Sequence, residues 1–338
     1  MSVTQTVLVR NMDNSNAEVE EQFLAADLKT MERLEEEDAK GRRKLQIVWL
    51  SVFRFSLMHI AAAVGGYLFF SDAMWKTCLW AFFLHIVGAM GITAGAHRYW
   101  SHRCFKATLP ARIIFMLMTT LAFQNDTIEW ARDHRCHHKW TDTDADPHNS
   151  RRGFFYSHMG WLMTKKNEKL REMGSKVDIS DLLADEVLMF QRRNYAILVV
   201  IVCFLLPTVV PVFFWGENPW VSYFVAGVFR YVFTLHSTFL INSAAHTFGY
   251  KPYDRKITAK ESVWTNMQAV GEGGHNFHHT FPQDYRASEF SWMTNWTRAL
   301  LDIMAFVGLI YDRKVISNEA IERQIAAKGD SLVHIHHH

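Results

Sequence analysis

The sequence predicts an all-α integral membrane protein, in which four transmembrane helices carry a cytosolic helical cap. Three observations predict this class. Four apolar segments are each long enough to cross a bilayer, which takes about 20 mostly apolar residues. The segments that connect them are strongly polar, and histidines recur in short clusters beside the ends of the apolar segments.

The predicted spans are the four long apolar runs of the chain. They are residues 47–70, 77–96, 195–215 and 219–241. A fifth apolar run, residues 110–123, is too short to cross a bilayer, so we expect an interfacial or buried helix there. The first 46 residues contain no apolar core of a signal peptide, so span one is expected to act as the signal anchor.

Lysine and arginine near the span ends predict the orientation, because short loops rich in these residues remain in the cytosol. They occur before span one, after span two, before span three and after span four, at residues 42–44, 98–112, 192–193 and 251–260. The two opposite loops carry only Lys76. Both termini and both large connectors are therefore expected in the cytosol, and the N-x-T sequons at Asn125 and Asn295 are expected to stay unmodified.

Three regions follow from this topology: a cytosolic N-terminal segment (1–46), a four-span domain with its cytosolic cap (47–314) and a cytosolic C-terminal tail (315–338). The first region contains apolar residues spaced like one face of a helix, which we expect to lie on the membrane or the cap. These residues are Phe23, Leu24, Leu28, Met31 and Leu34. The terminal HIHHH sequence (334–338) is left out of the site.

Composition excludes several other classes of function. A formal net charge of +2 without a long run of like charge gives no basis for nucleic-acid binding. The four cysteines include no C-x-x-C pair, so neither a zinc ribbon, an iron–sulfur cluster nor a disulfide framework is indicated. We expect the cysteines to be small buried hydrophobic residues.

Nine of the eighteen histidines fall in four short clusters. They are His97 and His102 in HRYWSH, His134, His137 and His138 in HRCHH, His246 in NSAAH, and His275, His278 and His279 in HNFHH. HRCHH and HNFHH share H-x-x-H-H spacing, which places three imidazoles on one face of a helix and allows them to converge on a metal. His97 and His102 are five residues apart, so this pair needs a helix end or bend to converge.

The ligand type leaves the metal open, because imidazole suits iron, zinc, copper and nickel. Nine ligands are too many for one ion, whereas two ions could each take four or five and keep an open position. Ligating histidines also need hydrogen-bond partners on the second nitrogen. The nearby carboxylates are Glu129, Asp133, Asp142, Asp146 and Glu272.

Isolated histidines are more often structural than ligating, and we favour that role for the five others that lie within or between the spans. They are His59, His85, His148, His158 and His236. Arg230 lies in the middle of span four, where a charge is costly and usually faces the bundle interior. We leave its role open and favour structural pairing.

Basic residues near HRCHH could bind an anionic phosphate headgroup or contact lipid headgroups. They are Arg132, Arg151, Arg152, Lys165 and Lys166. The two interpretations remain equally open for all of them except Arg132. Its place inside the histidine box favours binding.

The histidine boxes and their flanks resemble one family closely, from about residue 47 to 314. The segments that carry the resemblance are GITAGAHRYWSH (91–102), NDTIEWARDHRCHHKWTDTDADPHNSRRGFF (125–155), NSAAH (242–246) and AVGEGGHNFHHTFPQDYR (269–286). They resemble the membrane-bound acyl-CoA delta-9 desaturases, the stearoyl-CoA desaturase family. Box spacing, flanking residues and span order agree together.

This resemblance implies that the cap holds a di-iron site. The nine histidines would bind the two irons, and Asn242 would join them through a water. The CoA headgroup would be held by Asn125, Arg132 and Asp133, and the bend of the acyl tunnel would be shaped by Gln124, Trp130 and Thr238. From the basic group near HRCHH, Lys165 and Lys166 are further candidates for contact with the headgroup. Lys165 stands where relatives commonly have arginine, and Ser51 where they commonly have an asparagine that contacts CoA.

The helical rise of span two gives an estimate of the depth of the tunnel below His97. At about 1.5 Å per residue, Ala89 lies on the order of 12 Å and His85 roughly 18 Å from His97 along the helix. A saturated tail of about eight or nine carbons beyond the reacting bond is of order 10 Å long, so it would end near this pair. The resemblance places the tunnel floor here too.

The implied activity is insertion of a cis double bond at the delta-9 position of a saturated C16 to C18 acyl-CoA, with O2 as the oxidant. The sequence has no dinucleotide fingerprint or haem-attachment motif, so the two electrons need a separate donor. By resemblance that donor is cytochrome b5 with its NADH-dependent reductase, and the location is the endoplasmic reticulum membrane.

Two other functions stay open. A membrane di-iron lipid hydroxylase could use the same boxes, and its product would be an alcohol instead of an alkene. A metal transporter or metal-binding membrane protein is disfavoured, because transporters generally place their ligands near the bilayer midplane.

Overall fold

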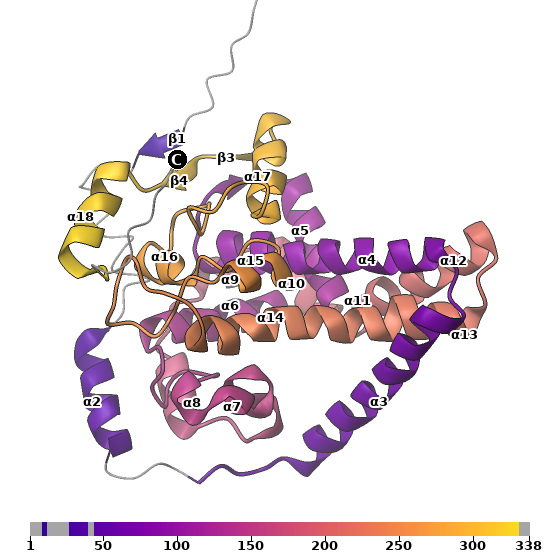
Figure 1. Ribbon diagram of the computed structural model, residues 1–338, viewed down its shortest axis with the longest axis horizontal. Helices are drawn as coiled ribbons and strands as arrows, with labels where there is room; N and C mark the ends of the chain where they lie inside the picture. The colour runs from indigo at the N-terminus through magenta and orange to yellow at the C-terminus, as the bar shows by residue number, and fades with distance from the viewer. Residues whose placement is uncertain (1–8, 12–26, 40–43, 331–338) are drawn as a thin grey trace, which may run out of the picture.

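Four long apolar helical segments form the membrane arm of the protein in the computed structural model, which describes residues 9–11, 27–39 and 44–330 (Figure 1). Span one is α3 (Trp49–Ser71), and span two is α4 (Trp75–Met90) continued by η1 (Gly91–Ser101). Span three is α11 (Tyr195–Val199), η4 (Val200–Leu205) and α12 (Leu206–Trp215), and span four is α13 (Pro219–Ser222), η5 (Tyr223–Phe229) and α14 (Arg230–Thr247). The prediction of four spans is confirmed.

The spans differ in how much of each is covered by protein. The most apolar stretches of spans two and four are 56% and 61% buried, whereas those of spans one and three are only 11% and 22% buried. Spans one and three therefore present apolar side chains outward, such as Phe70 and Phe213, as a helix facing lipid does. Spans two and four form the centre of the bundle and position the histidines.

Spans two and four run farther than their apolar composition predicts. They end at Ser101 and Thr247, not at residues 96 and 241. The polar residues that follow the apolar runs continue the same helices, because their backbone hydrogen bonds do not require apolar side chains. His97 and His246 consequently lie on the helices that extend the spans, not in connectors beyond them.

Spans two, three and four each contain a π-helical stretch, namely η1, η4 and η5. A π-helix bonds residue i to residue i+5 and is frequent at functional sites. Arg230 follows η5 and is buried, and its guanidinium donates to the backbone carbonyls of Ala226, Leu121 and Cys203. The expected pairing of this buried charge is therefore made with carbonyl oxygens.

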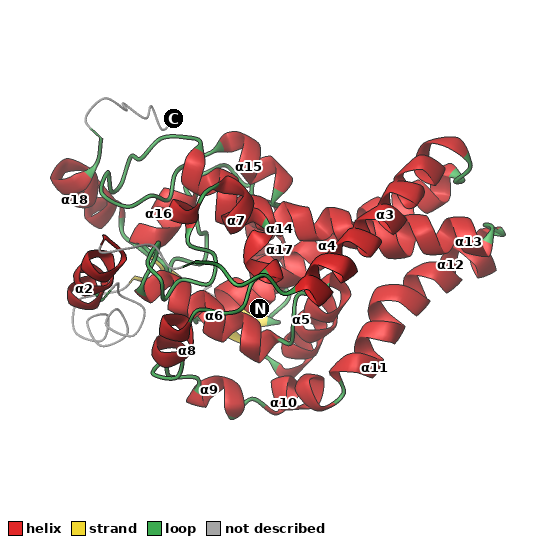
Figure 2. Ribbon diagram, turned by 90° about the horizontal axis from the view of Figure 1, so that it is seen from below, coloured by secondary structure: helices red, strands yellow, loops and turns green. Residues whose placement is uncertain are grey.

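The cap gathers at one end of the spans, as Figure 2 shows from below. The remaining helices are α2 (Leu28–Ala39), α5 (Leu109–Ala122), α6 (Thr127–Lys139), η2 (Ser150–Arg152), α7 (Phe154–His158), η3 (Gly160–Met163), α8 (Glu168–Gly174), α9 (Ser180–Leu183), α10 (Glu186–Arg193), α15 (Val263–Gln268), α16 (His275–Thr280), α17 (Trp296–Phe306) and α18 (Asn318–Lys328). Strand β1 (Val9–Asn11) pairs in parallel with β4 (Arg313–Val315), and β2 (Lys106–Ala107) pairs antiparallel with β3 (Ile310–Tyr311).

The N-terminal helix, the short apolar run and the cysteines largely agree with expectation. The N-terminal helix begins at Leu28, and its Leu34 is buried in the cap against Cys136, Trp140 and Leu170, so this face packs on protein. Residues 23 and 24 lie outside the described residues. The short apolar run forms α5, as expected. Of the four cysteines, three are buried and Cys78 is partly exposed.

Candidate metal centre and adjoining cavity

The nine histidines of the four sequence clusters lie together and divide into two groups, in which the potential ligand atoms are within 4.8 Å of one another. The larger group contains His97, His102, His134, His138 and His278. The smaller group contains His137, His246, His275 and His279. Five and four ligands match the expectation that two ions share the nine histidines.

In each H-x-x-H-H box, the middle histidine lies in a different group from the first and third histidines. In α6, His134 and His138 face the larger group, whereas His137 faces the smaller one. In α16, His275 and His279 face the smaller group and His278 faces the larger one. The expectation that each box converges on one metal is therefore wrong, because residues i and i+4 of a helix are better aligned than residue i+3. Each box spans both groups.

The spacing of the nitrogen atoms fits metal coordination. Nε2 of His278 lies 2.8 Å from Nε2 of His97 and 3.0 Å from Nε2 of His138. In the smaller group, Nε2 of His275 lies 3.0 Å from Nε2 of His246 and 3.2 Å from Nε2 of His279. Two metal–nitrogen bonds of about 2.0–2.1 Å at right angles would place the nitrogens about 2.9 Å apart. A neutral imidazole has only one N–H, so hydrogen bonds cannot satisfy all of these contacts.

His97 and His102 converge through the π-helix η1. The backbone N–H of His102 donates to the carbonyl of His97 at 3.1 Å, and the two ring centroids are 4.8 Å apart. Five residues correspond to one π-helical hydrogen bond, so the pair lies on the same side. The helix does end here, as expected, but the π-helical backbone brings the two rings together. This backbone change leaves no signature in the spacing of apolar residues.

Local capping contacts hold the two boxes. The side chain of Asp126 accepts from the backbone N–H groups of Ile128 and Glu129 and so caps α6. The buried Glu261 carboxylate accepts from the backbone N–H of Phe277 at 2.8 Å and caps the short helix α16. Burial raises the pKa of Glu261 to about 8.

Buried carboxylates orient three of the histidines through the nitrogen opposite the cluster. Nδ1 of His97 lies 3.0 Å from Oε2 of Glu272, and Nδ1 of His137 lies 2.9 Å from Oδ2 of Asp146. Nδ1 of His246 contacts Oγ1 of Thr258 at 2.9 Å, which in turn donates to Asp142. Three of the five expected carboxylates therefore take this role. Glu129 and Asp133 face Lys166 instead.

The electrostatics favour neutral imidazoles and ionised carboxylates in most of the cluster, whereas the facing Asp146 outweighs burial and raises the pKa of His137. Burial, with a further contribution from neighbouring histidines, holds the pKa well below its usual value in a set of ligands outside the spans. They are His134, His138, His275, His278 and His279. Burial alone would raise the pKa of Glu272, but the facing Arg98 and His97 outweigh it and lower that pKa. Neutral imidazole is the form that binds a metal.

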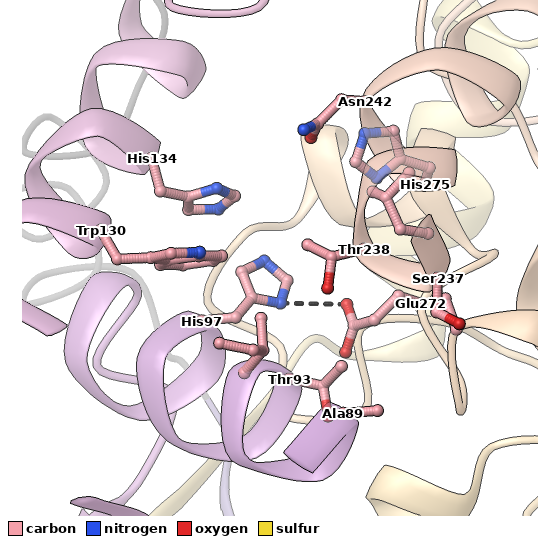
Figure 3. Close-up of a pocket in the computed structure, with 13 residues that line it drawn as sticks. Ala89, Thr93, His97, Trp130, His134, Ser237, Thr238, Asn242, Glu272 and His275 are labelled. Carbon is pink, nitrogen blue, oxygen red and sulfur yellow. Dashed lines mark ion pairs between the residues drawn. The ribbon is translucent and has the colours of Figure 1, made fainter. Parts of the chain in front are cut away.

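A cavity runs from the spans to the cluster and is lined by side chains of span two, α6, span four and the segment before α16 (Figure 3). Its lining residues are Ala89, Ile92, Thr93, His97, Trp130, His134, Ser237, Thr238, Ile241, Asn242, Ala269, Glu272 and His275. Three candidate ligands, from both groups, therefore face it. An apolar cavity with a few convergent polar groups is the usual form of a small-molecule site.

The expected tunnel residues lie in or beside this cavity. Ala89, Trp130 and Thr238 line it, as does Asn242. Gln124 lies behind the wall and donates to Oγ1 of Thr238 at 2.9 Å. His85 is buried one turn below Ala89, where its Nδ1 lies 3.1 Å from Oγ1 of Thr234, and it does not line the cavity.

The expected headgroup residues fall into a paired set and an exposed set. Arg132 and Lys166 both contact Asp133, at 2.9 and 2.7 Å. Asn125 is exposed at the turn before α6, with a positive φ of 69°, and Lys165 is also exposed. The two other basic candidates pair elsewhere, Arg151 with Glu35 and Arg152 with Asp144.

One isolated histidine has a closer relation to the cluster than its sequence position indicated. Nδ1 of His148 lies 3.4 Å from Oδ1 of Asp146, the carboxylate that orients His137. The D-x-H spacing of Asp146 and His148 was the sequence signal that could have indicated this contact.

Three other isolated histidines form a chain across the bundle. Nε2 of His236 lies 3.0 Å from Nε2 of His59, and Nδ1 of His236 lies 2.9 Å from Nε2 of His158.

The fold and the site together define a multi-pass membrane protein in which an apolar cavity reaches two buried histidine groups that could bind metal ions. The family model described as fatty acid desaturase matches residues 73–311 of the chain. The chain is 56% identical over 310 residues to Delta(9)-fatty-acid desaturase fat-6 of Caenorhabditis elegans, covering 92% of this chain and 91% of that protein. It is 51% identical over 287 residues to Stearoyl-CoA desaturase of Homo sapiens, covering 85% and 80%. The chain belongs to the fatty acid desaturase family, and it is an oxidoreductase.

Proposed function

We propose that the protein inserts a cis double bond at the delta-9 position of a saturated C16 to C18 acyl-CoA. The observation that carries this proposal is the meeting of an apolar cavity with both histidine groups, through His97, His134 and His275. The printed names of the relatives, Delta(9)-fatty-acid desaturase and Stearoyl-CoA desaturase, support the substrate class and the position.

Two irons are the proposed metals, held by the five and the four histidines, with Asn242 beside the smaller group. Together with O2 they would supply the oxidising power to remove two hydrogens from unactivated methylenes, which no side chain can do. The overall balance consumes one O2, two electrons and two protons, and it yields the alkene and two waters. Asn242 lines the cavity, so its amide can hold a water there.

The protein positions the chain and keeps the site dry. Trp130 stacks on His134, with ring centroids 5.0 Å apart, and so forms one wall beside the cluster. Thr238, which accepts a hydrogen bond from Gln124, lines the cavity from span four. The headgroup is proposed to lie outside the cavity, on Arg132, Asp133, Asn125, Lys165 and Lys166. The acyl chain would then pass inward along α6.

Electrons are proposed to come from cytochrome b5 and its NADH-dependent reductase, because the sequence has no dinucleotide fingerprint or haem-attachment motif. The proposed location is the endoplasmic reticulum membrane, with both termini cytosolic. We also keep the division into residues 1–46, 47–314 and 315–338 as a proposal.

The sequon at Asn125 tests this orientation. Its side chain is exposed, so a lumenal cap would expose it to glycosylation, and we expect none in the native membrane. A glycan on Asn125 would overturn the orientation. The sequon at Asn295 cannot serve, because that side chain is buried and donates to the carbonyl of Arg286.

Product analysis tests the reaction. The purified protein would be incubated with stearoyl-CoA, O2 and reduced cytochrome b5, and the lipid product examined by mass spectrometry. We expect a single cis double bond between carbons 9 and 10. A hydroxylated chain would support the oxygen-inserting alternative, and metal uptake without O2 consumption would contradict both reactions.

A further inference from the structure

The helix α17 has two opposite apolar faces, and residues of the described part of the chain cover only one of them. Leu301 and Met304 are buried in the cap. On the other face Trp296, Ile303 and Phe306 are 41%, 62% and 82% exposed. Arg298 and Asp302 form a polar strip between the two faces and lie 3.7 Å apart. A group of large exposed apolar side chains marks a surface that contacts a partner or a membrane. The outer face of α17 therefore needs a partner.

Neighbouring segments extend this exposed face. Trp264 and Met267 of α15 are 57% and 65% exposed, and Trp292, just before α17, is 63% exposed. Hydrogen bonds join these segments. The N–H of Thr297 donates to the carbonyl of Val270 at 3.0 Å, and the side-chain amide of Asn266 in α15 donates to the carbonyl of Thr294 at 2.9 Å. We call Trp264, Met267, Trp292, Trp296, Ile303 and Phe306 the cap belt. Three exposed tryptophans on joined segments are typical of a membrane interface, where their rings lie at headgroup level.

The position of α5 fixes the level of the cap belt relative to the spans. The carbonyl of Leu121, in the last turn of α5, accepts from Arg230 inside span four, so this end of α5 lies at membrane depth. The helix has 14 residues and is therefore about 21 Å long. At its other end, the N–H of Thr108 donates to the carbonyl of Leu309, just after α17. The end of α17 thus lies where α5 leaves the bundle.

The lipid-facing surface continues from the spans onto this region. Leu109, Ile113 and Leu117 of α5 are 54%, 41% and 39% exposed. Figure 1 shows α17 lying across the direction of α4, at the end of the spans nearest the cap. Interfacial helices are amphipathic and lie in the plane of the membrane surface with their apolar side towards the acyl chains.

From these contacts we infer that the cap belt is inserted in the bilayer, at the boundary between acyl chains and headgroups on the side of the histidine cluster. The cap is thus anchored to lipid by α15 and α17 in addition to the four spans. This inference does not depend on the reaction.

The inserted helices also hold the wall of the cavity. Ala269 and Glu272, which line it, follow α15 directly. Thr297 at the start of α17 places its Oγ1 2.7 Å from Oγ1 of Thr93, another lining residue. The cap belt therefore anchors this side of the cavity to the membrane.

Site-specific labelling tests the inference in the full-length protein. Phe306→Cys and, separately, Met267→Cys would be labelled with an environment-sensitive fluorophore and reconstituted in nanodiscs. Glu172→Cys, at an exposed position of α8, is the matched control, and the unmodified protein measures the background from the partly exposed Cys78. Phosphatidylcholine brominated in its acyl chains would be the quencher.

We expect brominated lipid to quench at least half of the fluorescence at positions 306 and 267, and to leave position 172 unchanged. Two labelled positions keep the test decisive if one variant fails to fold. Equal behaviour of all three positions would overturn the inference. Blue-shifted emission without quenching would overturn it too, because a protein surface, such as a second copy of the chain, would then cover the belt.

Discussion

Replacing Ala89 by phenylalanine tests how the cavity measures the acyl chain. Ala89 is buried, and among the cavity-lining residues of span two it lies farthest along the helix from His97. An added ring would fill the end of the cavity without contacting any histidine of the cluster. We therefore expect Ala89→Phe to shift the preference towards shorter acyl-CoAs while iron content stays the same.

The size of the shift follows from the methylenes that the ring excludes. Each methylene that loses its place in an apolar cavity loses about 0.8 kcal/mol. For two methylenes, the difference between C16 and C18 chains, this is about 1.6 kcal/mol. The ratio of kcat/KM for palmitoyl-CoA over stearoyl-CoA should therefore rise about 15-fold.

The assay is competition between the two substrates in one reaction, with both unsaturated products measured by gas chromatography. Ala81→Phe is the matched control, because Ala81 is equally buried in span two but packs against Val221 and Val225, away from the cavity. It should lower stability without changing chain-length preference. An equal loss of activity on both substrates in Ala89→Phe would mean that the helix is mispacked, and the cavity would no longer account for chain length.

Three further changes test the cluster and its supports. His278→Ala should abolish turnover and lower bound iron, measured by plasma mass spectrometry, whereas His158→Ala should keep its iron. Full activity of the His278→Ala variant would show that His278 is not part of the site. Glu272→Gln removes the carboxylate that faces the buried Arg98, so it should lower the free energy of unfolding by about 3–5 kcal/mol. It should also lower iron affinity by roughly 10- to 100-fold, and unchanged iron retention on dialysis would refute the orienting role. Burial raises the pKa of Glu261 from its usual 4.5 to about 8, so the folded state holds this proton and stability should fall as pH rises from about 4.5 to 8. Glu261→Gln should flatten that part of the thermal-midpoint profile, and an unchanged slope would contradict it.

The four spans could be predicted because apolar length is a local property of the sequence. The histidine boxes could likewise be found, because a helix aligns residues three and four apart. The exchange of His137 and His278 between the two groups could not, since it depends on how α6 and α16 meet in space. Neither could the π-helix that brings His97 and His102 together, because a shifted backbone hydrogen bond has no side-chain pattern.

The supports of the site were predictable only in part. Carboxylates close to a box in sequence, such as Asp146, could be proposed, but Glu129 and Asp133 looked equally suitable and face Lys166 instead. Side-chain direction on α6 decides between these roles, and spacing alone does not give it. The carbonyl partners of Arg230 come from three different segments, so no local pattern indicates them.

The central claim is that the histidines hold two irons at the end of an acyl cavity. Anomalous X-ray scattering at the iron edge, from crystals of the active protein, tests it most directly. We predict two peaks in each molecule, one inside the group of His97, His102, His134, His138 and His278, and one inside the group of His137, His246, His275 and His279. A single peak, or a peak outside these two groups, would contradict the account.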